Sequence, residues 1–241
     1  MPYLSLEEEI AAMTLQVAMI GSDGFLIVSD KKDYAPDAAL RNRKVKKIFI
    51  NHEQGTVLAV AGYSKTTDIA RELINQRYNP RERCDTEDLL KRCGKESYDS
   101  VHENRNINGQ LIFFEMKEPK RFWNVLIQER VYAQEYQDRW VASGDNKNLS
   151  LNFLETFFDV KKPISEQVFL AALCIYYGSK NNSGSISEEI DAVVVLNKGG
   201  TVHVHEMPPQ ELSQLVGSCK DFHHELSEAI QRYCYESRLN L

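Results

Sequence analysis

The order of strand-like and helix-like segments constrains the fold of this chain more than any other feature of its sequence. Strand-like runs occur in groups, and helical patterns occur in groups between them. A parallel sheet needs strands that alternate one by one with helices, so this grouping favours stacked antiparallel sheets covered by helices. The predicted strands cover residues 14–21, 25–30, 46–51, 56–62, 109–117, 121–129, 130–137 and 139–145, and a hairpin occupies 190–206.

The predicted helices fall between these groups of strands. Their apolar residues recur at helical spacing, and polar residues or proline mark their ends. Gly94 weakens the second helix, and Gly217 is expected to weaken or break the last one. No repeat, linker or low-complexity segment divides the chain, so a single domain is expected. The helices cover residues 65–78, 85–103, 149–158, 165–180 and 209–237.

Composition excludes several classes of function. The 241 residues carry a formal net charge of −6, so no basic field attracts a nucleic acid backbone. No apolar run reaches the roughly 20 residues that a membrane-spanning helix needs, and the acidic run Glu7–Glu9 is unlike a secretory signal. The five cysteines show no C-x-x-C spacing, which favours reduced thiols in a cytoplasmic protein.

The first predicted strand begins with an uncommon pair, Met13-Thr14. A turn signal, Ser22-Asp23-Gly24, follows this strand, and the next strand ends at Asp30. A threonine in a strand is, taken alone, a common structural residue. A threonine directly after a methionine can also become an amino terminus, and a terminal threonine carries a nucleophile and a base in one residue.

Four segments of the chain resemble motifs of the proteasome-type N-terminal-nucleophile hydrolases. They occur in the family's order and read TLQVAMIGSDGFLIVSDKK, KVKKIFINHEQGTVLAVAGYSKTTDIAREL, WVASGDNKNLSLNFLE and NSGSISEEIDAVVV. Together they are spread across nearly the whole chain. The resemblance implies an α+β fold, a four-layer αββα sandwich of two antiparallel sheets flanked by helices. It also implies that residues 14–241 form the domain and that residues 1–13 are an extension.

The resemblance assigns roles to individual residues. Thr14 takes the place of the family's nucleophile, Asp30 that of its acid and Lys47 that of its lysine. The backbone N–H of Gly62 falls on the oxyanion position. The value of these matches lies in their joint placement, since a strand-end acid or a lysine in a basic cluster is commonly only a solvated surface residue.

Four further positions follow from the same resemblance. The supporting serines fall on Ser143 and Ser183, and Val60 and Ser64 fall on the lining of a specificity pocket for a medium-sized apolar side chain. There is one departure. Where the family usually has an aspartate three residues before the second serine, this chain reads Lys180-Asn181-Asn182, so the network around that serine lacks an acid.

The same residues also make chemical sense without the family. A threonine hydroxyl is a weak nucleophile and needs a base within hydrogen-bonding distance. A free α-amine has an unperturbed pKa of about 7.7–8.0, close to the working pH, as a general base requires. A cation at Lys47 would lower that pKa, Asp30 would orient the lysine, and the Gly62 N–H would stabilise an oxyanion.

None of this chemistry operates while Thr14 is held in a peptide bond. Family precursors often cut themselves before the threonine, usually after glycine, whereas Met13 precedes it here. The alternative is translation from Met13 followed by removal of the initiator methionine. Codons for Glu7–Glu9 would then form a purine-rich ribosome-binding site upstream of that start. Either route predicts a working protein that begins at Thr14.

The resemblance also implies partners. It implies peptide or unfolded-protein substrates, a homo-oligomeric ring and an ATP-dependent unfoldase, with no cofactor, metal, nucleic acid or membrane. Two alternatives share the fold: a non-catalytic structural or gating subunit with a blocked Thr14, and an amidase or ligase acting on a small amide or one specific protein. His203 and His205 share one face of a strand, but no third ligand lies nearby in the sequence, which favours an ordinary surface strand.

Overall fold

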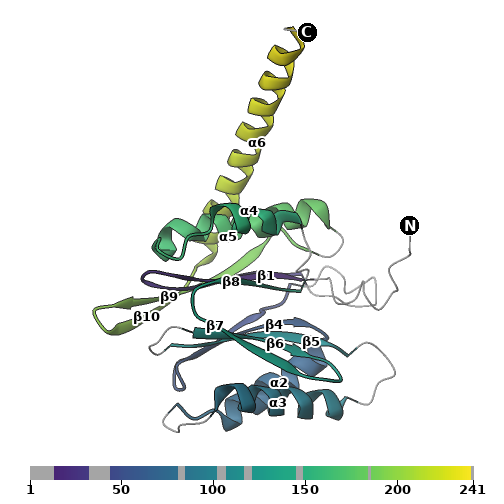
Figure 1. The fold of residues 1–241 in the computed structure, drawn as a ribbon, viewed down its shortest axis with the longest axis vertical. Coiled ribbons are helices and arrows are strands. Elements are labelled where there is room, and N and C mark those ends of the chain that lie inside the picture. Colours follow the sequence, from purple (N-terminus) through teal and green to yellow (C-terminus); the bar gives the residue numbers. More distant parts are fainter. Residues whose placement is uncertain are drawn as a thin grey trace.

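Two antiparallel sheets, stacked face to face and flanked by helices, make up the protein (Figure 1). The computed structural model describes residues 14–32, 44–80, 85–101, 107–116, 121–144, 149–183 and 186–239. From one side to the other, the layers are helix, sheet, sheet and helix. This is the four-layer αββα sandwich of the α+β class that the sequence predicts. The N-terminal extension, residues 1–13, lies outside the described residues.

The first sheet is built around the hairpin of β1 (Leu15–Gly21) and β2 (Gly24–Asp30). Alternate residues of β1 face opposite layers: Val17 packs under the helices, whereas Ala18 packs toward the second sheet. Both strands are therefore buried along their whole length, and their sequences read as continuous apolar runs. The strand order is β10-β9-β2-β1-β8, with β8 (Trp140–Gly144), β9 (Ile190–Lys198) and β10 (Thr201–Glu206).

The second sheet is an antiparallel meander, because its spatial order follows the chain. Three of its four strand pairs are joined by a short connection, as the strand and turn pattern of the sequence predicts, whereas the second and third strands are joined through residues 63–108, which contain both helices of this layer. The strands are β3 (Ile48–Asn51), β4 (Thr56–Gly62), β5 (Gly109–Glu115), β6 (Arg121–Ile127) and β7 (Tyr132–Tyr136).

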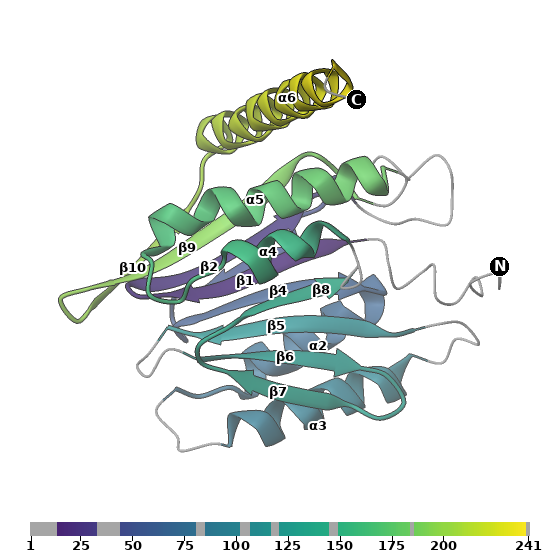
Figure 2. The same ribbon diagram turned by 45° about the horizontal axis from the view of Figure 1, so that its top comes forward.

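Helices cover the outer face of each sheet (Figure 2). The helices on the second sheet are α2 (Ser64–Arg77) and α3 (Thr86–Ser100). Asp85 caps α3 by accepting hydrogen bonds from the backbone N–H groups of the first turn. The first sheet is covered by a short 3₁₀ turn, η1 (Leu149–Leu151), with α4 (Asn152–Phe157), α5 (Ile164–Asn181) and the long α6 (Pro209–Leu239).

The two glycines expected to weaken helices have different outcomes. Gly94 lies inside α3, where a Cβ atom would come within 3.0 Å of Val131 Cγ1, so the missing side chain allows close packing. The expected break at Gly217 is wrong, because α6 runs without interruption through it. The buried residues Leu212 and Cys219 anchor α6 on both sides of Gly217. Their packing outweighs the roughly 1 kcal/mol that glycine costs a helix.

The two sheets are held together by an apolar layer rich in aromatic rings. Phe25 of β2 stacks on Phe114 of β5, with ring centroids 3.9 Å apart and planes 5° apart, and it also contacts Phe122. All three rings are buried. Among the described residues, none of the helices combines the length and apolar character that a membrane-spanning segment needs.

We expect Phe25→Ala to lower the free energy of unfolding by about 3–5 kcal/mol, because loss of the ring leaves a cavity between the sheets. Phe157→Ala is the matched control: that ring is 60% exposed, and its loss should cost less than about 1 kcal/mol. Urea unfolding followed by circular dichroism measures both values. Equal losses in the two variants would contradict a central role for the Phe25 stack.

Candidate active site

Thr14, Lys47 and Asp30 meet at one end of the sandwich. The Lys47 ammonium donates hydrogen bonds to Thr14 Oγ1 at 2.8 Å and to Asp30 Oδ1 at 2.9 Å. All three residues are buried, and Asp30 is 1% exposed. The sequence separates them by up to 33 residues, but the start of β1, the end of β2 and the residue before β3 converge here.

Asp30 is held in place from four directions. Besides the Lys47 ammonium, Asp30 Oδ1 accepts the backbone N–H of Leu15 at 3.1 Å. Its Oδ2 accepts the backbone N–H groups of Lys32 at 3.0 Å and Ser187 at 3.3 Å. These hydrogen bonds fix the position of the Asp30 carboxylate, which in turn holds the Lys47 ammonium toward the threonine hydroxyl.

A buried glutamine joins the two sheets next to this cluster. Gln16, two residues after Thr14, is fully buried and donates from Nε2 to the Val60 carbonyl oxygen at 2.6 Å and to Ser29 Oγ at 3.2 Å. Its Oε1 accepts the hydroxyl of Ser143 at 2.7 Å. Gln16 therefore connects the nucleophile strand to β2 and β8 in its own sheet and to β4 in the other sheet.

Gly62 lies at the exposed end of β4, two residues beyond the Val60 carbonyl that Gln16 binds. Its φ of +96° favours glycine, and a Cβ atom would lie 2.6 Å from the Asn108 carbonyl oxygen. Gly144, at the end of β8, is under a similar constraint. Its φ is +81°, and a Cβ atom there would lie 1.9 Å from the Thr14 carbonyl oxygen. Both glycines therefore permit close backbone approach around Thr14 and β4.

The two predicted serines occupy different environments. Ser143 is fully buried on β8, directly opposite Gln16 in the strand pairing, and its hydroxyl is bound to that side chain. Ser183 is exposed just after α5, and its carbonyl oxygen accepts a hydrogen bond from Lys32 Nζ at 2.8 Å. The segment after α5 is therefore linked to Asp30 in two ways. The Ser187 N–H bonds to Asp30 directly, and Lys32 bonds to Ser183 with its side chain and to Asp30 with its backbone N–H.

The departure at residues 180–182 places a cation where the resemblance implies an acid. Lys180 forms an ion pair with Glu188 across the loop, with 2.5 Å between Nζ and Oε1. Their mutual hydrogen bond raises the pKa of the Lys180 ammonium and lowers the pKa of the Glu188 carboxyl. Asn182 directly follows the last residue of α5, and its backbone N–H donates to the carbonyl oxygen of Gly178.

The two positions predicted to line a specificity pocket lie at the end of β4 and the start of α2. Val60 is half-buried, and its side chain packs on the apolar cluster between the second sheet and its helices. Ser64 is exposed at the first residue of α2, where its carbonyl accepts the hydroxyl of Thr67 at 3.0 Å. The two residues flank Gly62 along the chain.

Sequence reasoning missed several polar residues of this network. Gln110 on β5 accepts the Gly144 N–H at 2.9 Å and donates to Asn124 Oδ1 at 3.0 Å, which extends the network across the second sheet. Ser29 and Gln16 are fully buried. The sequence did hold a signal for two of them. Gln16 and Gln110 are single amides inside largely apolar strands, and a buried amide is costly unless it is hydrogen-bonded, which predicts polar partners for both.

The described cysteines are poor candidates for a nucleophile. Cys93, Cys174 and Cys219 are all buried free thiols. Burial raises the pKa of Cys174 and of Cys219 to about 12, so both stay protonated near neutral pH. Cys84 and the side chain of Cys234 lie outside the described part of the chain.

The histidines offer no metal site in the described residues. His203 and His205 are exposed on β10, and His205 Nε2 lies 2.8 Å from Glu211 Oε2. Across residues 14–239, with the gaps given above, no group of three potential metal ligands gathers. The surface-strand interpretation of these histidines agrees with their exposure.

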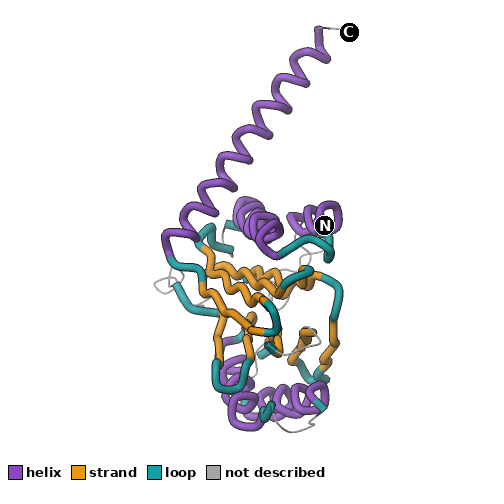
Figure 3. The backbone as a smooth tube through the Cα atoms, turned by 90° about the vertical axis from the view of Figure 1, so that its left-hand side faces the viewer, coloured by secondary structure: helices purple, strands orange, loops and turns teal. Residues whose placement is uncertain are grey.

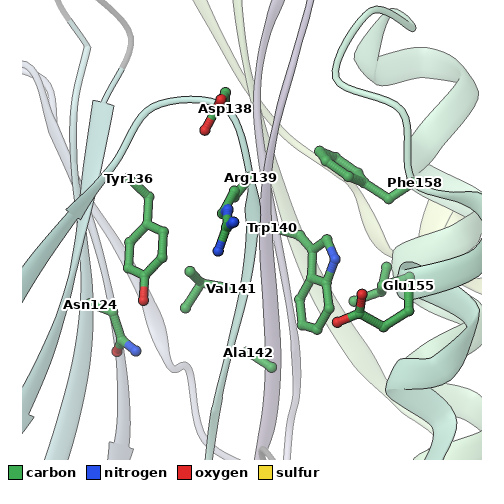
Figure 4. Close-up of a pocket in the computed structure, with 10 residues that line it drawn as sticks. Asn124, Tyr136, Asp138, Arg139, Trp140, Val141, Ala142, Glu155 and Phe158 are labelled. Carbon is green, nitrogen blue, oxygen red and sulfur yellow. The ribbon is translucent and has the colours of Figure 1, made fainter.

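A separate pocket of about 580 Å³ opens between the edges of the two sheets. Tyr136, Arg139 and Asn124 lie toward the second sheet, and Trp140 and Phe158 lie toward α4 (Figure 4). Trp140 pairs with Met19, four residues along β1 from Leu15. This pocket is therefore displaced along β1 from Thr14, although the amide chain through Asn124 and Gln110 reaches Gly144.

Solved structures of Anbu proteins share this fold. The protein "Anbu (ancestral beta-subunit) from Yersinia bercovieri" is 14% identical over 90% of this chain and 96% of its own, with a TM-score of 0.70. The Gly-1 mutant of Anbu from Hyphomicrobium sp. strain MC1 is 16% identical over 89% and 96%, also with a TM-score of 0.70. The structure titled "Helical Assembly of the Anbu Complex from Pseudomonas aeruginosa" is 15% identical over 89% of this chain and 96% of its own, with a TM-score of 0.69.

At these identities the likeness establishes the fold. Comparisons with protein-family models and with curated protein sequences find no match. The roles of the site residues therefore depend on their geometry in this chain.

We expect Gln16→Ala to lower the free energy of unfolding by about 2–4 kcal/mol, because the Ser143 hydroxyl and the Val60 carbonyl lose their buried partner. Gln137→Ala is the matched control, since that amide is exposed and donates to the Glu135 side chain on the surface. Chemical denaturation of both variants measures the difference. A loss at Gln16 no larger than that at Gln137 would show that the amide does not hold the sheets together.

Proposed function

We propose that this chain is a threonine-type peptidase, a proteasome-like subunit in which Thr14 acts as the nucleophile once it becomes the amino terminus. The observation that carries the proposal is the buried contact of the Lys47 ammonium with both Thr14 Oγ1 and Asp30 Oδ1. A lysine held charged by a carboxylate and directed at a hydroxyl oxygen favours the alkoxide-like form of that hydroxyl. The shared fold with an Anbu protein titled an ancestral beta-subunit supports it.

The reaction follows from these positions. The free α-amine of Thr14 accepts the hydroxyl proton as Oγ1 attacks the carbonyl carbon of a peptide bond. The Gly62 N–H donates to the oxyanion while the Lys47 cation stabilises the charge that develops at Oγ1. The Thr14 ammonium then returns the proton to the leaving amine, which leaves an ester on Oγ1. Water, activated by the same amine, hydrolyses this ester and restores the free threonine.

The remaining residues have supporting roles in this proposal. Asp30 orients Lys47, and Gln16 and Ser143 fix the start of β1 relative to β4 and β8. Ser183 belongs to the segment that reaches Asp30, and Val60 and Ser64 border the place of a substrate side chain. Peptides or unfolded polypeptides are the proposed substrates.

Residues 1–13 form an extension that is absent from the working protein, which leaves 14–241 as the hydrolase domain. In the described structure Thr14 is 7% exposed, so its hydroxyl sits inside the site. Attachment of a preceding residue removes the amine base, since an amide nitrogen is not basic. Self-cleavage or translation from Met13 followed by methionine removal would free it.

Self-assembly is the second part of the proposal. The Pseudomonas aeruginosa structure is titled a helical assembly of the Anbu complex. We infer that this chain forms a cytoplasmic homo-oligomeric ring that receives substrates from an ATP-dependent unfoldase, which would confine proteolysis to an enclosed space.

A non-catalytic subunit of the same fold is the second candidate, and one observation favours it. Residues 180–182 carry no acid, and Lys180 pairs with Glu188 instead. A scaffold subunit keeps Thr14 blocked, whereas an enzyme exposes it, so processing separates the two. An amidase or ligase acting on a small amide or on one specific protein shares the freed Thr14 and differs only in substrate.

The first experiment is an intact-mass measurement of the protein made from its own gene, without a tag at the amino terminus. We expect a mass that corresponds to residues 14–241, because only a free Thr14 amine supplies the base. A chain that still begins at Met1 in the assembled, native protein would favour the non-catalytic subunit.

The second experiment measures hydrolysis of a panel of fluorogenic peptides by chains that start at Thr14. Thr14→Ala should lower kcat/KM by about a thousandfold or more, because it removes the nucleophile. Thr14→Ser should keep part of the activity. Thr156→Ala is the control, because this threonine is exposed and its hydroxyl donates to the Asn152 carbonyl of its own helix. Equal rates for Thr14→Ala and the unaltered chain would refute threonine catalysis.

A further inference from the structure

The edge strand β8 carries free backbone groups on its outer side. It ends the strand order of the first sheet and pairs with β1. The Arg139 carbonyl accepts the Ile20 N–H at 3.3 Å, so every second residue from Arg139 onward directs its backbone groups toward β1. Trp140 and Ala142 therefore direct theirs outward. Within the described part of the chain, no hydrogen bond reaches these four outward N–H and C=O groups.

The two edges of the first sheet differ in how they are protected. Proteins commonly protect an edge strand with charged side chains, proline or a bulge, because free backbone groups pair readily with another extended chain. At one edge, β10 carries His203, His205 and Glu206. At the other edge, β8 reads WVASG, with no charge and no proline, and its register with β1 is unbroken. The outer side of β8 is therefore open to pairing with an additional strand.

The pocket of about 580 Å³ runs along this open edge, because three consecutive residues of β8 line it, 140–142. Side chains alternate along a strand, so a pocket that touches three in a row covers both faces of the edge. Trp140 and Ala142 pack on the helix side, whereas Val141 packs between the sheets. Figure 3 shows the layers in section, with helices outside both sheets. The pocket is accordingly bounded by α4 on one side and by the second sheet on the other.

The side of the edge that faces α4 is largely apolar. Trp140 and Phe158 are half-buried there, and Leu154 is buried. The one charged residue of this side, Glu155, is exposed on α4. Facing residues of neighbouring strands lie on the same face of a sheet. An apolar side chain opposite Trp140 or Ala142 would therefore pack on this side.

The side that faces the second sheet offers hydrogen-bond donors. The Arg139 side chain and the Tyr136 hydroxyl lie on this side (Figure 4). Gln110 donates to Asn124 Oδ1, which leaves the Asn124 Nδ2 group as a donor. Arg139 is exposed, and among the described residues its guanidinium forms no ion pair, not even with Asp138 beside it. Acidic side chains at alternate positions of an added strand match these donors.

We propose that the outer edge of β8 binds an extended segment of a partner polypeptide as an added strand, with apolar residues toward α4 and acidic residues toward Arg139 at alternate positions. Its backbone pairs with the outward groups of Trp140 and Ala142. About five residues span the five of β8, at ~3.4 Å per residue. The proposal goes beyond the peptidase reaction and does not depend on it, because the pocket is displaced along β1 from Thr14.

The recess at this edge selects a single strand over a second folded copy of the chain. Val141 is 5% exposed and Ala142 is 8% exposed, so the edge lies below the surface formed by α4 and the second sheet. One extended segment fits between those walls, whereas the edge of a second sandwich, with its own flanking layers, is held away.

Fluorescence anisotropy of a dye-labelled peptide, Leu-Asp-Leu-Asp-Leu, tests the proposal on the full-length chain, and saturable binding is expected. Only one alternate set of peptide N–H groups faces β8 in either strand direction. Methylation of the leucine nitrogens and methylation of the aspartate nitrogens should therefore differ at least tenfold in their effect on the dissociation constant. A peptide of the same composition without alternation, Leu-Leu-Leu-Asp-Asp, should bind at least tenfold more weakly.

Charge reversal at Arg139 tests the side-chain match. Arg139→Glu should raise the dissociation constant of the aspartate peptide roughly tenfold and should favour Leu-Lys-Leu-Lys-Leu instead. Arg130→Glu is the matched control, because Arg130 is exposed and lies outside the pocket lining, and it should leave both constants unchanged. Circular dichroism melts check that each variant remains folded.

Tryptophan fluorescence locates the bound peptide. The chain has two tryptophans, and Trp123 is 1% exposed on the helix-covered face of the second sheet. Peptide binding should change the fluorescence of the unaltered chain but not that of Trp140→Phe. The proposal is overturned if the alternating peptide does not bind or if both methylated peptides bind equally. It is also overturned if Arg139→Glu behaves like Arg130→Glu, or if Trp140→Phe keeps the fluorescence change.

Discussion

The ion pair between Lys47 and Asp30 is the interaction on which the site depends. Both side chains are taken out of water at the end of the sandwich, which is costly unless every polar atom finds a partner. The backbone N–H groups of Leu15, Lys32 and Ser187 supply those partners for Asp30. Removing one member of such a buried pair costs about 3–5 kcal/mol. The ends of β1 and β2 and the loop before β9 are therefore fixed relative to one another.

The two ends of the sandwich are held by different forces. At the turn end of the first hairpin, Phe25 and Phe114 stack and apolar side chains of both sheets pack together. At the other end, Gln16 binds Val60 across the sheets, and the layer is polar. Apolar packing at the first end stabilises the fold but does not favour one precise geometry, because the hydrophobic effect is non-directional. The polar end fixes geometry, because each hydrogen bond has a preferred length and angle.

Much of the fold was accessible from the sequence. The apolar runs and turn signals predict both sheets, since strands buried on two faces read as continuous hydrophobic segments. The break expected at Gly217 is wrong because the cost of one glycine is small beside the burial of Leu212 and Cys219. The contact among Thr14, Asp30 and Lys47 was expected from a family resemblance. No local pattern places a lysine 33 residues away against a threonine hydroxyl.

The sequence by itself determined the grouping of strands and helices, the layered α+β class and the presence of a threonine at the mouth of the first strand. Local periodicity and turn chemistry act over a few residues, so they suffice for these features. Only the tertiary structure decided that Gln16 and Gln110 join the network around Thr14, and that β8 keeps an open edge between α4 and the second sheet. Those outcomes depend on which surfaces meet, and long-range packing alone sets that.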